Sequence, residues 1–99
     1  MKNLIERDKK RRNLVLKYEQ KRAVLKYLIS NRNLSTGTRW QAGLDLSHLP
    51  KNSSKIRLNS RCIVTGRGKS ISRSFRLSRI MLRMFASSGS ISGLRKSSW

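Results

Sequence analysis

The acidic residues of this 99-residue chain are confined to its first half, and this asymmetry limits its possible folds more than any other feature. The four acids are Glu6, Asp8, Glu19 and Asp45, so residues 46–99 carry twelve Lys/Arg and no Asp or Glu. A formal net charge of +20 makes the chain repel itself, and only 36% of the residues are hydrophobic, which leaves little apolar surface to offset that repulsion. We therefore expect one small domain that completes its fold on a strongly negative partner.

The first third of the chain predicts one long helix. No Gly or Pro occurs in residues 3–31, and Asp8 and Arg12 are spaced i,i+4 in the favourable order. Four apolar side chains recur at spacings of four, seven and three, which places them on one helix face: Leu14, Tyr18, Leu25 and Leu28.

A second, shorter helix is predicted between a break at residues 31–37 and Pro50. Thr38 and Gln41 have the spacing of a capping box, so we expect Thr38 to begin this helix. Three of its apolar side chains should pack against the face of the first helix: Trp40, Leu44 and Leu49. The following residues 51–60 are polar and basic with little periodicity, which indicates an extended linker.

Four positions in the last third have the spacing of a four-cysteine zinc knuckle, C-x2-T-x12-S-x2-M. They are Cys62, Thr65, Ser78 and Met81, so only one is a cysteine. Structural zinc requires four nitrogen or sulfur ligands, and the hydroxyls of Thr65 and Ser78 are poor ones. We expect a knuckle-like turn without metal, in which these side chains pack and form hydrogen bonds.

The remaining C-terminal elements follow from turn and cap residues. Thr65 to Gly68 predicts a tight turn whose glycines permit positive φ, followed by a basic loop. Ser78 should cap a short helix that Gly89 ends, and residues 90–99 should be a docked tail. This helix should turn four side chains inward: Ile80, Met81, Met84 and Phe85.

Sequence signatures of catalysis and of cofactor binding fail when tested in detail. The Gly68-Lys69-Ser70 run lacks the earlier glycine of a phosphate-binding loop, because position 63 is Ile63. Cys62 and His48 have no acid to orient the histidine and nothing to activate the thiol. The single cysteine excludes an intramolecular disulfide. We expect no enzyme activity, no cofactor and no metal.

The basic segment favours RNA as the partner. Arginine outnumbers lysine seven to one from Arg57 to Arg83, and its planar guanidinium can bridge phosphates and stack on unpaired bases. These properties favour irregular RNA over duplex DNA, recognised by shape rather than by base sequence. A cationic membrane-active or RNA-chaperone-like protein is the alternative, since the first helix could lie on anionic lipid. No apolar run reaches the length of about 20 residues that spans a bilayer.

The C-terminal half resembles the family of universal small-subunit ribosomal protein fourteen, in its longer metal-free form. The similarity covers essentially the whole chain, and the segments that carry it are Leu49 to Ser54, Arg61-Cys62, Thr65 to Arg67, Phe75, Leu77 to Ile80, Arg83, Gly89, Gly93-Leu94 and Lys96 to Trp99. The resemblance implies a structural component of the ribosomal small subunit that binds ribosomal RNA in the head near the decoding region. It also implies ribosomal proteins three, ten and nineteen as neighbours, rather than a free homo-oligomer.

On this interpretation the chain has three segments: a basic helical extension (1–50), an extended basic linker (51–60) and a knuckle-like RNA-binding module with its tail (61–99). The run Phe75 to Ile80 and the Lys96 to Trp99 ending resemble mitochondrial members of the family more than plastid or bacterial ones, so we expect a mitochondrial ribosome, with plastid or bacterial cytoplasm as the alternative. The residues expected to contact RNA are Lys9, Arg11, Arg12, Lys51, Arg57, Arg61, Arg67, Lys69, Arg73, Arg76, Arg79, Arg83, Arg95, Lys96 and Trp99.

Overall fold

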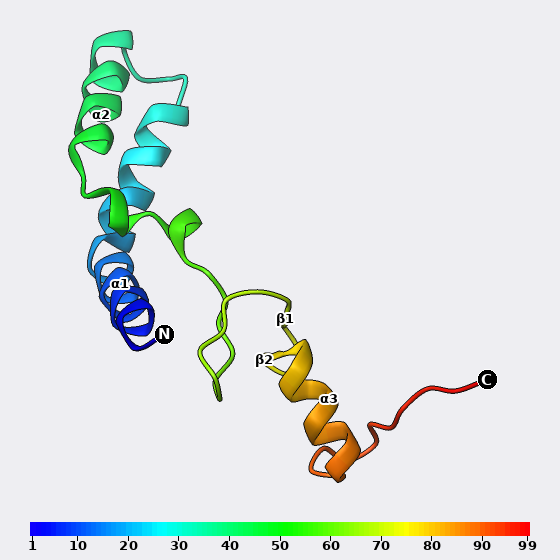
Figure 1. The fold of residues 1–99 in the computed structure, drawn as a ribbon. Coiled ribbons are helices and arrows are strands. Elements are labelled where there is room, and N and C mark those ends of the chain that lie inside the picture. Colours follow the sequence, from blue (N-terminus) through cyan, green and yellow to red (C-terminus); the bar gives the residue numbers. More distant parts are fainter. The chain divides into compact units, whose positions relative to one another are not determined.

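A computed structural model describes residues 1–99, and its regular structure is mainly helical, which confirms the predicted fold class (Figure 1). In chain order the elements are α1 (Lys2–Ser30), α2 (Thr36–His48), η1 (Lys51–Ser53), η2 (Lys55–Arg57), β1 (Ile71–Ser72), β2 (Leu77–Ser78) and α3 (Arg79–Ser88), where η denotes a 3-10 helix. The chain forms two compact units: Glu6–Leu58 is one, and Met1–Ile5 with Asn59–Trp99 is the other.

Helix α1 agrees with its prediction to within one residue at each end. Leu25 is buried, and the other members of the predicted stripe, Leu14, Tyr18 and Leu28, are half-buried. Asp8 and Arg12 form the expected i,i+4 ion pair, with 2.7 Å between Oδ2 and Nε. The absence of helix breakers and the apolar spacing were therefore sufficient to define this element. No helix in the structure is both long enough and apolar enough to cross a membrane.

Helix α2 begins earlier than its capping-box pattern predicted. Ser35, not Thr38, is the N-cap: its hydroxyl accepts a hydrogen bond from the Thr38 amide at 3.4 Å and lies 2.8 Å from the Thr38 hydroxyl. Ser35 and Thr38 are both good capping residues. The prediction was wrong because the residue three positions upstream takes the cap, which places Thr38 inside the first turn.

The face of α2 that packs also differs from its prediction. Ala42 is the buried residue at 4% exposure, and it lines a shallow groove together with Leu25 and Leu28 of α1. Trp40 is 72% exposed and Leu44 39% exposed, so their predicted burial was wrong. Ala42 is two positions after Trp40, which is about 200° around a helix, and turning Ala42 inward therefore turns Trp40 outward. Figure 1 shows α2 running beside the C-terminal half of α1.

The linker after Pro50 forms two short 3-10 turns rather than the predicted extended segment. The Ser53 amide donates to the Pro50 carbonyl at 3.0 Å and the Arg57 amide to the Ser54 carbonyl at 3.2 Å. Arg22 of α1 holds the first turn, because its Nε donates to the Ser53 hydroxyl at 2.9 Å. In an extended linker the backbone groups would form hydrogen bonds with water. Here several of them form hydrogen bonds within the chain, and the linker therefore adopts short 3-10 turns.

The C-terminal unit has a very small core in which Cys62 and Leu77 are buried. Strands β1 and β2 pair antiparallel, so the segment predicted as a basic loop contains a short hairpin with Ile71 opposite Ser78. Ser78 caps α3 and Gly89 ends it at φ 74, both as predicted. On α3, however, Ile80 and Met84 are exposed rather than inward-facing, while Met81 and Phe85 are half-buried.

Candidate nucleic-acid interface

The turn around Cys62 keeps the geometry of a knuckle through backbone hydrogen bonds. The Cys62 amide donates to the Arg67 carbonyl at 2.9 Å, and the Gly66 amide donates to the Cys62 carbonyl at the same distance. Gly66 has φ 75, a conformation that a residue with a Cβ adopts only with strain. Gly68 does not share this conformation; the other positive φ values in this unit outside its glycines belong to Ser70 and Arg76.

Hydrogen-bond donors act on the sulfur of Cys62, the one thiol among the four knuckle positions. The Thr65 hydroxyl donates to this sulfur, and the amides of Thr65, Ser78 and Val64 also donate to it. These donors stabilise the thiolate and outweigh burial, which opposes it, so they lower the pKa of Cys62 to about 6. No group of three or more His, Cys, Asp or Glu side chains is placed to hold a metal ion.

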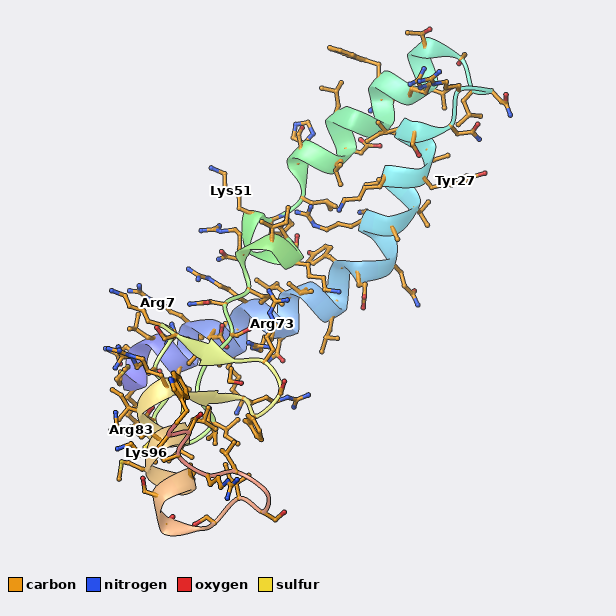
Figure 2. All side chains as sticks on the ribbon, turned by 90° about the vertical axis from the view of Figure 1, so that its right-hand side faces the viewer. Arg7, Tyr27, Lys51, Arg73, Arg83 and Lys96 are labelled. Carbon is orange, nitrogen blue, oxygen red and sulfur yellow. The ribbon has the colours of Figure 1, made fainter.

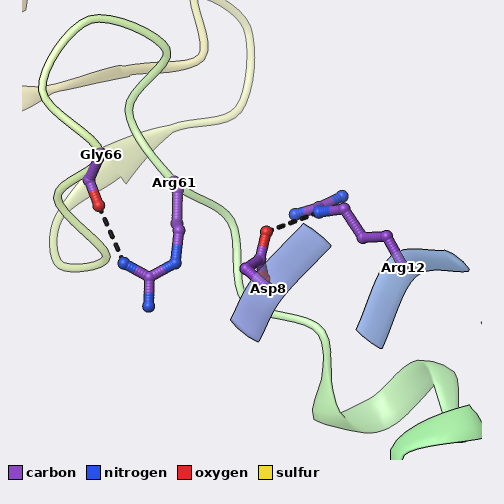
Figure 3. Close-up of polar contacts among 4 residues, drawn as sticks. All are labelled: Asp8, Arg12, Arg61 and Gly66. Carbon is purple, nitrogen blue, oxygen red and sulfur yellow. Dashed lines mark hydrogen bonds and ion pairs between the residues drawn. The ribbon is translucent and has the colours of Figure 1, made fainter. Parts of the chain in front are cut away.

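Two of the predicted RNA-contacting arginines have partners within the chain (Figure 3). Arg61 donates from Nη1 to the Gly66 carbonyl at 2.8 Å, so it supports the knuckle turn from one side. Its Nε is buried and has no hydrogen-bond partner in the chain. Arg12 is paired with Asp8, as described above. Both side chains therefore have a structural role as well as a positive charge.

The hairpin and the residues just before it carry four cations and no acid. Arg73 and Arg76 lie in the connection between β1 and β2 and are exposed, as is Lys69, while Arg67 is half-buried. The Arg76 amide donates to the Ser72 carbonyl at 2.7 Å, and the Ile63 amide donates to the Arg76 carbonyl at 3.1 Å. These bonds fix the backbone that carries the guanidinium groups while leaving the groups themselves outward.

Helix α3 and the chain that follows it bring four cations around one open pocket of about 520 Å³. Arg79 and Arg83 come from α3, and Arg95 and Lys96 come from the tail; Arg83 and Lys96 are labelled in Figure 2. The pocket also includes Leu82, Ala86, Ser87 and Leu94 and has no acidic residue. Residues separated by up to seventeen positions in sequence thus form one positive site, which we call the α3–tail pocket.

The tail docks only in part. Leu94, Arg95 and Lys96 line one pocket with residues of α3, and Leu94 is half-buried, but Arg95 and Lys96 are exposed and Trp99 is fully exposed, so the end of the tail is not docked as predicted. The remaining predicted contact residues, Lys9, Arg11, Lys51 and Arg57, belong to the Glu6–Leu58 unit and are exposed, apart from the half-buried Arg11.

Two arginines that sequence reasoning did not single out are structural. Arg22 holds the linker, with Nη2 donating to the Pro50 carbonyl at 3.1 Å, and Arg39 donates from Nε to the Ile29 carbonyl at 3.0 Å. Each guanidinium satisfies a carbonyl at the end of a helix or turn. Arg22 and its partner Pro50 are 28 positions apart, and Arg39 and its partner Ile29 are 10 positions apart. Neither spacing corresponds to a helix or strand period, so the sequence did not indicate these contacts.

These features define a small, basic, mainly helical protein whose knuckle is closed by hydrogen bonds. The family profile described as "Ribosomal protein S14p/S29e" matches residues 45–98. The chain is 50% identical to "Small ribosomal subunit protein uS14m" of Marchantia polymorpha over the full length of both proteins. It is 50% identical to the protein of the same name from Prototheca wickerhamii, covering 98% of each chain.

A bacterial relative is almost equally similar. "Small ribosomal subunit protein uS14" of Roseobacter denitrificans is 49% identical and covers 99% of this chain and 97% of its own. The chain therefore belongs to the ribosomal protein S14p/S29e family. Its relatives are structural proteins of the ribosome and not enzymes, and the same holds for this chain.

Proposed function

We propose that this protein binds small-subunit ribosomal RNA in the head of the subunit, near the decoding region, through the α3–tail pocket and the cations of the hairpin. The observation that carries the proposal is the convergence of Arg79, Arg83, Arg95 and Lys96 on one pocket without an acid. In a free protein such a pocket gathers like charges at an energetic cost. When a polyanion binds, its negative charges attract these cations and offset the repulsion between them.

The mechanism is electrostatic and entropic. Each Lys or Arg that neutralises an RNA phosphate releases a condensed counterion, which makes affinity depend strongly on salt and little on base sequence. Guanidinium groups can also bridge two phosphate oxygens, so arginines at the hairpin tip can hold two RNA strands close together. The knuckle supplies a rigid base for these side chains, because its backbone hydrogen bonds tie residues 62–67 and the hairpin together.

The remaining cations extend the proposed contact surface over three segments, 1–50, 51–60 and 61–99. The exposed side chains Lys9, Lys51 and Arg57 would reach phosphates beyond the α3–tail pocket, and the fully exposed Trp99 would stack on an unpaired base. Arg61 and Arg12 would contribute charge from their structural positions.

We further propose ribosomal proteins three, ten and nineteen as neighbours, from the family resemblance, and the mitochondrion as the compartment. The relative named uS14m is 50% identical to the chain and a bacterial relative named uS14 is 49% identical. Overall sequence identity therefore favours neither the mitochondrion nor a bacterial cytoplasm. The mitochondrial proposal rests on the run Phe75 to Ile80 and the C-terminal Lys96 to Trp99.

Cosedimentation tests both proposals. The tagged chain, expressed in its own organism, should sediment with small ribosomal subunits from mitochondria at moderate salt and should be absent from vesicles of anionic lipid. Recovery with vesicles instead of subunits would overturn the ribosomal RNA proposal, and recovery with cytosolic or plastid subunits would overturn the compartment.

A further inference from the structure

Helix α2 is electrically unlike the rest of the protein. Helix α1 carries ten Lys/Arg and three acids, a formal charge of +7, and residues 51–99 carry twelve Lys/Arg and no acid. The thirteen residues of α2 contain only Arg39, Asp45 and the neutral His48, so the formal charge of this helix is zero. In a chain with a net charge of +20, α2 is a neutral surface.

The same helix leaves its largest apolar side chain outside the core. Trp40 is 72% exposed, and together with Leu44 and Ile29 it lines an open groove of about 510 Å³, which we call the Trp40 groove. Gly43 forms part of the groove wall, and no atom lies within 4 Å of the position that a Cβ would take there. The groove is therefore open at the point where a side chain from outside could enter.

Two of the three polar side chains that line the Trp40 groove, those of Arg39 and Ser47, form hydrogen bonds within the chain; the third is Thr36. The Ser47 hydroxyl donates to the Leu44 carbonyl at 2.7 Å. Arg39, the single charged residue that lines the groove, donates from Nε to the Ile29 carbonyl at 3.0 Å and is part-buried by that contact. What the groove offers to a ligand is mainly the indole ring and aliphatic carbon.

This chemistry favours a protein ligand over RNA. Aromatic platforms that stack nucleic-acid bases are accompanied by cations that hold the adjoining phosphates, and the Trp40 groove has only the engaged Arg39. The cores of protein interfaces, by contrast, are depleted of charge and enriched in tryptophan and other aromatic residues. An exposed indole beside an aliphatic groove is a typical binding hot spot.

We infer that the Trp40 groove binds an aliphatic side chain, flanked by uncharged residues, of a neighbouring protein in the assembled ribosomal particle. This inference rests on the proposed function for the assembly itself. It divides the surface of the chain into cationic parts that contact RNA and one neutral helix that contacts protein.

Site-specific photo-crosslinking in assembled subunits tests the inference. Trp40 of the full-length chain is replaced by p-benzoylphenylalanine, and Arg73, an exposed cation of the hairpin, is replaced in a parallel variant. Irradiated particles should give a protein adduct from position 40 and an RNA adduct from position 73. An RNA adduct from position 40, or no adduct there while position 73 reacts, would overturn the inference. Absence of the RNA adduct from position 73, with an intact protein adduct at position 40, would count against the proposed RNA contact alone.

Matched alanine variants give a second measurement. Tyr27 is a suitable control because it is 66% exposed, points away from α1 in Figure 2 and does not line the groove. Trp40→Ala should weaken retention in salt-washed subunits by about tenfold or more, since a hot-spot residue has at least that effect on Kd, whereas its affinity for naked ribosomal RNA should match that of Tyr27→Ala. Equal retention of the two variants would contradict the inference.

Discussion

The hydroxyl of Ser78 accepts a hydrogen bond from the amide of Met81 at 3.4 Å, so two of the four knuckle positions are joined by a helix cap. In a zinc-binding knuckle both positions would hold cysteine ligands. Here the cap ties the second half of the knuckle to α3, and Ser78 is among the most buried polar residues of the chain, at 1% exposure.

Ser78→Ala should destabilise the bound form of the C-terminal unit by about 1 kcal/mol, the typical loss when an N-cap hydroxyl is removed. The measurement is hydrogen exchange of the α3 amides in the RNA-bound protein. Ser87→Ala is the matched control, because the exposed Ser87 hydroxyl only donates back to the Arg83 carbonyl of the same helix. Equal protection in both variants would show that the cap contributes nothing.

The Cys62 thiol should titrate far below its ordinary pKa of 9.0. Its folded pKa is lowered to about 6 by the Thr65 hydroxyl and backbone amides, so the thiolate stabilises the knuckle fully above pH 9 and this contribution disappears as the pH falls through about 6. Cysteine-selective ¹³C NMR of the RNA-bound protein gives a single resonance whose midpoint reports this pKa. Thr65→Ala should raise the midpoint. A midpoint near 9 in the parent protein would show that the fold does not stabilise the Cys62 thiolate.

Gly66→Ala should weaken the knuckle turn. The backbone there has φ 75, and an added Cβ would lie 2.6 Å from Cδ1 of Ile5. The Ile5 side chain can move, so the dominant effect is the left-handed backbone, at about 1 to 2 kcal/mol. Gly37→Ala is the control, since nothing lies within 4 Å of its Cβ position and its φ is not positive. Occupancy of the two variants in reconstituted subunits at increasing temperature compares them, and equal occupancy would argue against strain at Gly66.

Removal of a cation from the α3–tail pocket should change the salt dependence of RNA binding. Arg83→Ala should reduce the slope of log K against log salt by about one unit for the phosphate contact that is lost. Arg83→Lys keeps the charge and should leave the slope unchanged, although affinity should fall because the bidentate guanidinium is gone. Filter-binding titrations over a range of salt concentrations measure both variants. If Arg83→Ala has the same slope of log K against log salt as the parent protein, Arg83 does not contact a phosphate.

The free protein should lack a cooperative thermal transition in low salt. Its buried apolar residues are few, namely Val15, Leu25, Ala42, Cys62 and Leu77, and they cannot offset the chain entropy and the repulsion of a +20 charge. Circular dichroism should show partial helix that melts gradually, and addition of ribosomal RNA should sharpen the transition. A sharp transition in the free protein would contradict this.

The sequence by itself determined the elements whose signals are local. Residues 3–31 contain no helix breaker and carry an apolar stripe, so α1 was predictable. Ser78 and Gly89 act on the ends of α3 through their own backbone and hydroxyl groups, and both were identified from residue type. The positive surface was equally predictable, because no acid follows Asp45 and the Lys and Arg side chains after it have no carboxylate of that segment to neutralise them.

Only the tertiary structure decided which surfaces face inward and which residues meet. Hydrophobicity alone placed Trp40 in the core, but the short connection at residues 31–35 and the bond from Arg39 to Ile29 fix a rotation of α2 that buries Ala42 instead. Likewise Arg83 and Lys96 share a pocket only because the chain turns back after Gly89. Helix ends depend on neighbours in sequence, whereas the rotation of a helix and the return of a tail depend on contacts between distant residues, which leave no periodic pattern in the chain.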